Sequence, residues 1–290
     1  MNARVLIIKI YFLIALTAVS LGCHAQVLWE VSGNGLKDKS YILGCNHLLA
    51  SGSLTGVPGV FHAYNQCERV VSEFEIDEQS AVAAMMSYGK ADTMMDELLT
   101  LDELAFVDSV MRKDVGLGTQ AFMYFKPGIV TAIWIEAVCQ SLYPRGEDDE
   151  PMDSYFQKMA IIEGKEVRPL ERLDDQMSLL LKGSERDQAS ELVRLMHEGR
   201  GKLKVDVEAI TKMFNEGDLE GLASVEEREM SETDRHSQVE ERNEKWLGTL
   251  VEMMRQKRCF VVMRCINMVG NAGMLRALRA KGYIVKAVKE

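Results

Sequence analysis

One histidine of the chain stands where an imidazole could do chemistry. His47 closely follows the apolar run 41–43, and Gly44 lies three residues before it. A glycine permits a tight backbone path out of a strand, and a neutral imidazole at the end of such a path can bind a divalent metal. A histidine kept for structural reasons alone is the alternative. The pattern therefore makes His47 a candidate metal ligand.

A carboxylate is the second candidate for chemistry. Glu73 follows a β-branched pair in a segment that predicts a strand over 69–76. A carboxylate on an internal strand is costly to bury unless it is paired or metal-bound. Glu75 should share the face of Glu73, and repulsion between them would raise the pKa of one and suit it to general-base catalysis. The alternative is that Glu73 lies on an edge strand, with its carboxylate on a solvent-exposed polar face.

The elements that must position these groups follow from the spacing of apolar residues. Strands are predicted over 27–31, 40–44, 69–76, 166–170, 259–263 and 283–288. Helices are predicted over 101–112, 126–140, 152–163, 186–198, 205–216, 239–257 and 271–281. No linker rich in Gly, Ser or Pro divides the chain. We therefore expect one α/β domain over 26–290 with a large helical insertion at about 79–257.

A weak internal repeat relates the two ends of the chain. Segments 41–47 and 261–267 each carry an apolar strand, then a polar residue and the approach to a helix. A duplicated unit would bring the two loops together. Loops beyond strand ends are where α/β sheets tend to gather ligands, so a site is expected at these loops.

The composition limits the class of protein. The chain has 290 residues, of which 47% are hydrophobic and 27% charged, which excludes a disordered or collagen-like protein. Lys and Arg number 34 against 44 Asp and Glu, so the formal net charge is −10. Because there is no basic surplus to neutralise phosphates, no nucleic-acid partner is expected.

The segment 1–25 predicts a secretory signal peptide. Arg4 and Lys9 precede an apolar stretch over 10–21, and small residues precede a cleavage site before Gln26. Lipidation of Cys23, which would anchor the protein to a membrane, is the alternative. No later apolar run is long enough to span a bilayer. We therefore expect a secreted or periplasmic protein whose remaining cysteines are buried free thiols and not zinc ligands.

Several motifs, taken in order, resemble one known family. A Trp-containing strand, a turn and a strand ending in G-x-x-H occupy 28–47, and a strand with an acidic residue follows at 70–75. Shorter matches follow in the family's order: Ala91-Asp92-Thr93, Lys126-Pro127, Pro169-Leu170-Glu171, Arg242-Asn243-Glu244-Lys245-Trp246 and Lys281-Gly282-Tyr283-Ile284-Val285. In order and spacing the chain resembles the TraB/GumN family, which is related to the Tiki metalloproteases.

The resemblance implies a fold and an activity. The fold would be α/β with two related small half-sheets, as in erythromycin esterase-like and ChaN-like proteins, and the site would lie between them. The activity would be metal-dependent hydrolysis of peptides by a metal-activated water. His47 and Glu73 would hold Mn, Co or Zn, with Glu73 also catalytic, and Arg242 would stabilise the oxyanion or hold a substrate carboxylate.

The second G-x-x-H motif departs from the family's pattern. In an alignment on Gly270, Arg264 stands where the glycine belongs and Asn267 where the histidine belongs. Asn is a poorer ligand than imidazole for a transition metal, and the charge of Arg264 opposes a dication. Asn267 would then orient water or substrate. The resemblance therefore implies a weakened metal site.

The sequence leaves three functions open. The first is a peptidase-like metal-dependent hydrolase with a weakened site. The second is a catalytically inactive relative that binds a peptide or a small anionic ligand in the old pocket, with Arg264 and Arg242 as the cationic anchor. The third is an envelope protein whose helical insertion contacts a partner.

Overall fold

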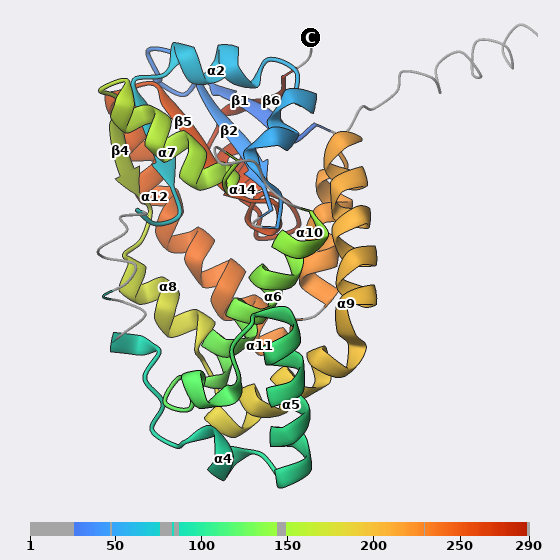
Figure 1. Cartoon of the computed structure of the whole chain (residues 1–290). Helices are drawn as coiled ribbons and strands as arrows, with labels where there is room; N and C mark the ends of the chain where they lie inside the picture. Colours follow the sequence, from blue (N-terminus) through green and yellow to red (C-terminus); the bar gives the residue numbers. More distant parts are fainter. Residues whose placement is uncertain are drawn as a thin grey trace, which may run out of the picture.

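A six-stranded β-sheet forms one end of the molecule and a group of helices forms the other (Figure 1). The computed structural model describes residues 26–46, 48–75, 83, 87–143, 149–228 and 230–288. The expected signal peptide over 1–25, with Cys23, and the candidate ligand His47 lie outside the described residues. The strands are β1 (Leu28–Ser32), β2 (Ser40–Cys45), β3 (Arg69–Ser72), β4 (Glu166–Pro169), β5 (Cys259–Arg264) and β6 (Ile284–Ala287).

The strand order places the ends of four parallel strands at one edge. The order is β4-β3-β5-β2-β1-β6. Strands β2, β5, β3 and β4 run parallel to one another, whereas β1 pairs antiparallel with β2 and with β6. The central strands β2 and β5 are buried almost throughout, as their apolar runs predict for strands covered on both faces. The residues that follow the four parallel strands therefore meet at the carboxyl edge of the sheet.

The register brings the two repeat loops together, as the internal repeat predicts. Cys45 of β2 lies opposite Arg264 of β5. The predicted α/β fold with a helical insertion is confirmed, and the strands of the two expected half-sheets are joined in one continuous sheet. The strand predicted over 69–76 is shorter, because β3 ends at Ser72. Glu73 therefore follows the strand instead of lying within it.

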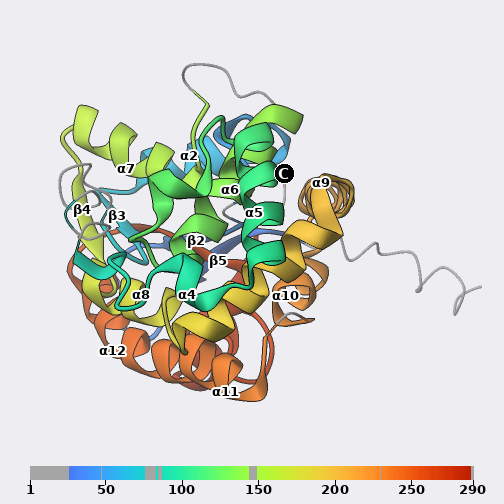
Figure 2. The ribbon, with the colours of Figure 1, turned by 60° about the horizontal axis from the view of Figure 1, so that its bottom comes forward.

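Helices cover both faces of the sheet and build the insertion. Figure 2 shows α2 and α7 on one side of the sheet and α12 on the other. The described helices and helical turns are η1 (Ser51–Gly56), α2 (Val60–Gln66), α4 (Met95–Leu98), α5 (Leu101–Asp114), η2 (Thr119–Phe122), α6 (Pro127–Leu142), α7 (Met152–Ile162), α8 (Leu173–Leu180), α9 (Glu185–Asn215), α10 (Leu219–Arg228), α11 (Glu232–Arg235), η3 (His236–Glu240), α12 (Glu241–Gln256), α13 (Cys265–Met268) and α14 (Met274–Ala280). Among the described residues, no helix has the length and apolar character that crossing a membrane requires.

Helix α9 connects two hydrophobic cores. The larger core lies on the sheet and the smaller one lies in the helical insertion. Leu192, on the first arm of α9, packs in the smaller core, and Phe214, on the second arm, packs in the larger core. Between the arms, Gly199 has φ 74° and ψ −177°, a conformation almost exclusive to glycine. The helices predicted over 186–198 and 205–216 are therefore the two arms of one broken helix.

The cysteines after the expected leader are all buried: Cys45, Cys67, Cys139, Cys259 and Cys265. No disulfide joins them within the part of the chain that the structure describes. Burial raises the pKa of Cys67 and of Cys259 to about 12, so both remain thiols at neutral pH. The prediction of buried thiols is confirmed.

Gly44 is required by packing at the end of β2. A Cβ at this position would lie 2.9 Å from the side chains of Leu219 and Met268 and 3.0 Å from Sγ of Cys265. All three neighbours are buried, so they have little room to move away. The missing side chain of Gly44 therefore lets β2 approach α10 and α13 closely.

We expect Gly44→Ala to lower the free energy of unfolding by about 1–3 kcal/mol, the usual cost of overpacking a core. Gly248→Ala is the control, because Gly248 is exposed on α12 and a Cβ there meets no atom within 4 Å. The control should raise the free energy of unfolding by up to about 1 kcal/mol. Urea denaturation measures both values, and equal effects of the two substitutions would contradict the packing role.

Arg69 at the start of β3 holds Glu166 at the start of β4. Its Nε and Nη2 atoms donate to Oε2 of Glu166 at 3.0 and 2.9 Å. The hydrogen bond from Arg69, with smaller contributions from Lys257 and Arg168, lowers the pKa of Glu166 from 4.5 to about 2. This ion pair therefore ties two parallel strands together at their amino ends.

The ion pair predicts how stability depends on pH. Because the pKa of Glu166 is lower in the folded chain, the pair stabilises the fold fully above pH 4.5 and loses this effect as the pH falls towards about 2. Glu166→Gln should therefore flatten the loss of unfolding free energy over this window. Glu244→Gln, at an exposed position of α12, should leave the profile unchanged. Urea titrations at a series of acidic pH values test this, and identical profiles for Glu166→Gln and the original protein would disprove it.

Candidate functional site

Charged side chains meet at the carboxyl edge of the sheet. Glu73 follows β3, Glu171 follows β4 and Arg264 ends β5. Helix α10 adds Glu226 and helix α12 adds Arg242. Ion pairs join these five residues, which we call the charged cluster. Its members come from segments far apart in the sequence and alternate in sign, so the cluster depends on the tertiary fold.

Glu73 lies at the centre of the charged cluster and is 4% exposed. Its Oε2 accepts a hydrogen bond from Nη2 of Arg242 at 2.9 Å. Its Oε1 accepts one from the backbone N–H of Arg264 at 2.7 Å, and Nε of Arg264 lies 3.6 Å from Oε2. A buried carboxylate is tolerated where such cations and hydrogen bonds offset the loss of solvation. Glu73 is therefore an anion that holds two arginines in place.

Arg242 joins two carboxylates from neighbouring strand ends. Besides its bond to Glu73, Nε and Nη2 donate to the carboxylate of Glu171 at 3.1 and 2.7 Å. The guanidinium also lies over the Trp246 ring, 4.3 Å from its centre. Burial raises the pKa of Glu171, although the hydrogen bond from Arg242 acts in the opposite direction. The charge of Arg242 is therefore matched by carboxylates of the protein itself.

Arg264 differs because its guanidinium lacks close partners. Nη1 lies 3.7 Å from Oε2 of Glu226, and Nε lies 3.6 Å from Glu73, both longer than a hydrogen bond. Among the described residues, buried Nε has no hydrogen-bond partner. Burial acts to lower the pKa of Arg264, but Glu73 and Glu226 outweigh it and raise the pKa above its ordinary value. Arg264 is therefore a permanent cation with donors left for another acceptor.

Two pockets reach the charged cluster. The first, which we call the strand-end pocket, has a volume of about 420 Å³ and is lined by the ends of β2 and β5, both arms of α9, and α10. The second has a volume of about 570 Å³ and is lined by α8, α12 and the loop after β4. Arg264 and Glu226 line the first, and Arg242 and Glu171 line the second. Glu73 lies between these two pairs.

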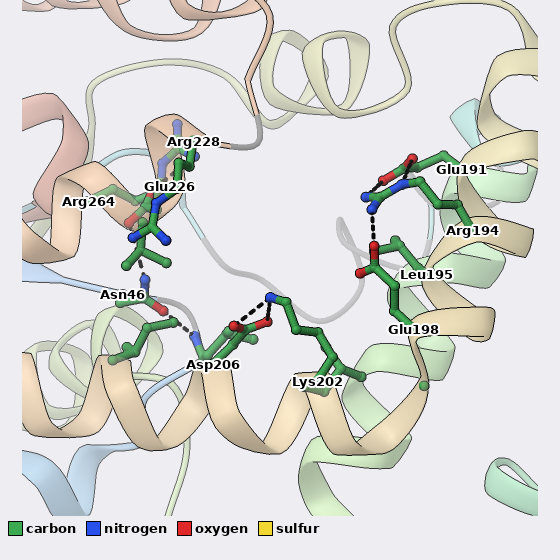
Figure 3. A pocket seen from close by; sticks show the side chains of 15 residues that line it. Asn46, Glu191, Arg194, Leu195, Glu198, Lys202, Asp206, Glu226, Arg228 and Arg264 are labelled. Carbon is green, nitrogen blue, oxygen red and sulfur yellow. Dashed lines mark hydrogen bonds and ion pairs between the residues drawn. The ribbon is translucent and has the colours of Figure 1, made fainter.

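The strand-end pocket has charged groups at both ends. Figure 3 shows Arg264, Glu226 and Arg228 gathered at one end. At the other end, Glu191, Arg194 and Glu198 pair with one another on the first arm of α9. Lys202 pairs with Asp206 on the second arm, along the wall between the two ends. The charged groups of α9 are therefore paired with one another, whereas Arg264 makes only the longer ion pairs described above.

The structure brings some sequence-predicted residues together and separates others. Glu73, Arg242 and Arg264 form one contact network. The expectation that Glu73 and Glu75 share a face is wrong, because β3 has already ended: Glu73 is buried whereas Glu75 is exposed. Repulsion from Glu75 therefore gives Glu73 no general-base character.

Asn267 is buried away from both pockets. It is 0% exposed, and its Nδ2 donates to Oδ1 of Asn243 at 3.2 Å. Asn243 in turn donates to the backbone carbonyls of Asn267 and Ala272 at 2.9 and 2.8 Å. Gly270, with φ 77°, turns the chain between them. These contacts tie the loop between α13 and α14 to α12, and substrate binding by Asn267 stays a prediction.

The described residues around Glu73 do not fit a divalent metal. Both carboxylate oxygens already accept hydrogen bonds, one from Arg242 and one from the backbone of Arg264. A dication at Glu73 would lie near the charge of Arg264, and at about 4 Å the two would repel by roughly 2 kcal/mol even in bulk water. No group of three or more His, Cys, Asp or Glu among the described residues has the arrangement of a metal site. Metal binding that involves His47 stays a prediction.

Four residues of the site are absent from the sequence-based prediction. Glu171 and Gln176 both accept hydrogen bonds from Arg242, the latter at 2.8 Å, and Asn46 donates to Glu226 at 3.2 Å. Glu171 and Asn46 could have been identified from the sequence as candidate site residues, since each closely follows a predicted strand. Glu226 carries no signal, because it lies among other acidic residues of α10.

We expect Arg242→Ala to lower the free energy of unfolding by about 3–5 kcal/mol, because removing one partner leaves buried charges uncompensated. Lys245→Ala, at an exposed position on the same helix, should change it by less than about 0.5 kcal/mol. Chemical denaturation followed by circular dichroism gives both values. A loss below about 1 kcal/mol for Arg242→Ala would contradict the structural role.

The chain matches a known protein family. The model of the TraB/PrgY/gumN family matches residues 27–287, which includes every strand and both pockets. No curated protein and no solved structure matches the chain.

Proposed function

The chain belongs to the TraB/PrgY/gumN family, and from this premise we propose that it is an exported protein that binds an anionic ligand in the strand-end pocket without hydrolysing it. The observation that carries the proposal is Arg264, a guanidinium that lines that pocket and whose ion pairs with Glu73 and Glu226 are longer than hydrogen bonds. The signal peptide expected over 1–25 supports export. The ligand classes that present a suitable anion include peptides and small carboxylates.

The position and chemistry of Arg264 support binding of an oxyanion. Ligands of α/β proteins commonly lie at the carboxyl ends of the strands, which is where Arg264 ends β5. Its side chain is only 11% exposed, so a bond to it is shielded from solvent. A guanidinium offers paired N–H donors to a carboxylate, and such charge-assisted hydrogen bonds are stronger than neutral ones.

The surroundings of Glu73 support binding without hydrolysis. A general base or metal ligand must have an oxygen available for the proton or the metal. Glu73 instead accepts hydrogen bonds at both oxygens, one from the guanidinium of Arg242 and one from the backbone N–H of Arg264. The residue at the second motif position, Asn267, is engaged with Asn243.

Metal-dependent peptide hydrolysis is the competing function. The family relationship favours it, together with the position of Glu73 at the carboxyl edge of the sheet. Mn, Co or Zn would supply a Lewis acid that activates water. This function requires a metal-binding set that includes residues outside the described part of the chain.

We expect at least one apolar carboxylate among leucine, 4-methylpentanoate and leucyl-leucine to bind saturably. Arg264→Gln should weaken this binding about tenfold or more, because a charge-assisted hydrogen bond contributes roughly 1.5–3 kcal/mol. Arg172→Gln is the matched control, since Arg172 is 80% exposed and lines the other pocket. Calorimetric titration of the purified protein measures the affinities.

Two outcomes would overturn the proposal. One is the absence of any carboxylate binding that depends on Arg264. The other is peptide hydrolysis by the unmodified protein with Mn, Co or Zn, abolished by Glu73→Gln. Hydrolysis that appears only when Arg264→Gly and Asn267→His are combined would instead support loss of an ancestral activity.

A further inference from the structure

The strand-end pocket places an anion directly beside its cation. Oε2 of Glu226 lies 3.7 Å from Nη1 of Arg264. The two side chains are 15% and 11% exposed, so both are largely shielded from bulk water. At this separation the two groups attract each other without a hydrogen bond. The end of the pocket therefore presents a negative and a positive group side by side.

Asn46 fixes the orientation of Glu226. Its Nδ2 donates to Oε1 of Glu226 at 3.2 Å, and its Oδ1 accepts from the backbone N–H of Leu48 at 3.0 Å. Asn46 directly follows the end of β2 and is only 5% exposed, so its side chain has little room to move. Because Oε1 is used by Asn46, Oε2 is the oxygen that faces Arg264.

The remainder of the pocket supplies apolar walls. Leu48 follows β2, Leu203 and Ile210 come from the second arm of α9, and Val225 comes from α10. The volume of about 420 Å³ falls within the range of small-molecule sites, in which apolar walls surround a few polar groups. The pocket therefore suits a ligand with a charged head and an apolar body.

This inference rests on the proposed function and specifies its ligand. We propose that the strand-end pocket binds an α-amino acid with an apolar side chain. Its carboxylate accepts hydrogen bonds from Arg264, and its ammonium group donates to Glu226. A single carbon separates these two charges in an α-amino acid, so they require a cation and an anion that lie next to each other. The apolar side chain then contacts the walls of α9 and α10.

The proposal explains why the pocket keeps a carboxylate beside its arginine. A ligand that carried only an anion would be repelled by Glu226, which reduces the benefit of Arg264. A zwitterion interacts favourably with both groups at once, because each of its charges lies next to a protein charge of opposite sign. Glu226 is therefore the residue that distinguishes a zwitterion from a simple anion, and Asn46 positions it.

The experiment compares ligands that differ in one charged group. Leucine, leucinamide and 4-methylpentanoate share the side chain, but leucinamide lacks the carboxylate and 4-methylpentanoate lacks the ammonium. Calorimetric titration of the full protein near neutral pH should give leucine at least tenfold tighter binding than either analogue. This comparison needs no variant, so it tests the proposal even if a substitution impairs folding.

A matched pair of substitutions tests whether Glu226 recognises the ammonium group of the ligand. Glu226→Gln should remove most of the preference for leucine over 4-methylpentanoate, and Glu220→Gln, at an exposed position of the same helix, should keep it. Binding of 4-methylpentanoate as tight as leucine, with both dependent on Arg264, would overturn this inference but preserve anion binding as the function. Failure of every carboxylate to bind would overturn the proposed function itself.

Discussion

The structure depends on one buried carboxylate held between two arginines. Glu73 follows β3 and binds the side chain of Arg242 and the backbone of Arg264. These contacts join β3, β5 and α12 at the carboxyl edge of the sheet. A buried charge is stable only when its partners stay in place, so the cluster fixes the positions of both arginines. The guanidinium of Arg242 is bonded to Glu73 and Glu171, whereas that of Arg264 lines the strand-end pocket.

The strand-end pocket exists because α9 belongs to two cores at once. Its first arm packs in the helical insertion, and its second arm packs against the sheet. The break at Gly199 lets the arms follow different directions, and residues of both arms line the pocket. The charged side chains of α9 pair within each arm. The charged groups that would contact the proposed ligand are therefore Arg264, at the end of β5, and Glu226, on α10.

The altered second motif has a physical meaning in this setting. Arg264, at the end of β5, is a permanent cation, and it would repel a dication placed at the same edge. The same guanidinium is well suited to a carboxylate. A residue that disfavours a metal at this edge is thus suited to the anion that we propose. Because Glu226 lies beside Arg264, the ligand that we propose carries both charges.

The sequence by itself determined the α/β class, the six strands and the helical insertion, because the periodicity of apolar residues is local and strong. The strand pattern before Glu73 also identified that residue, whereas Arg242 and Arg264 were identified by their positions in the motifs that resemble the family. Only the tertiary structure decided what these residues do. Glu171 and Glu226 complete the charged cluster from distant segments, and the early end of β3 separates Glu73 from Glu75. Such pairings depend on strand order and helix packing, which no local pattern of residues encodes.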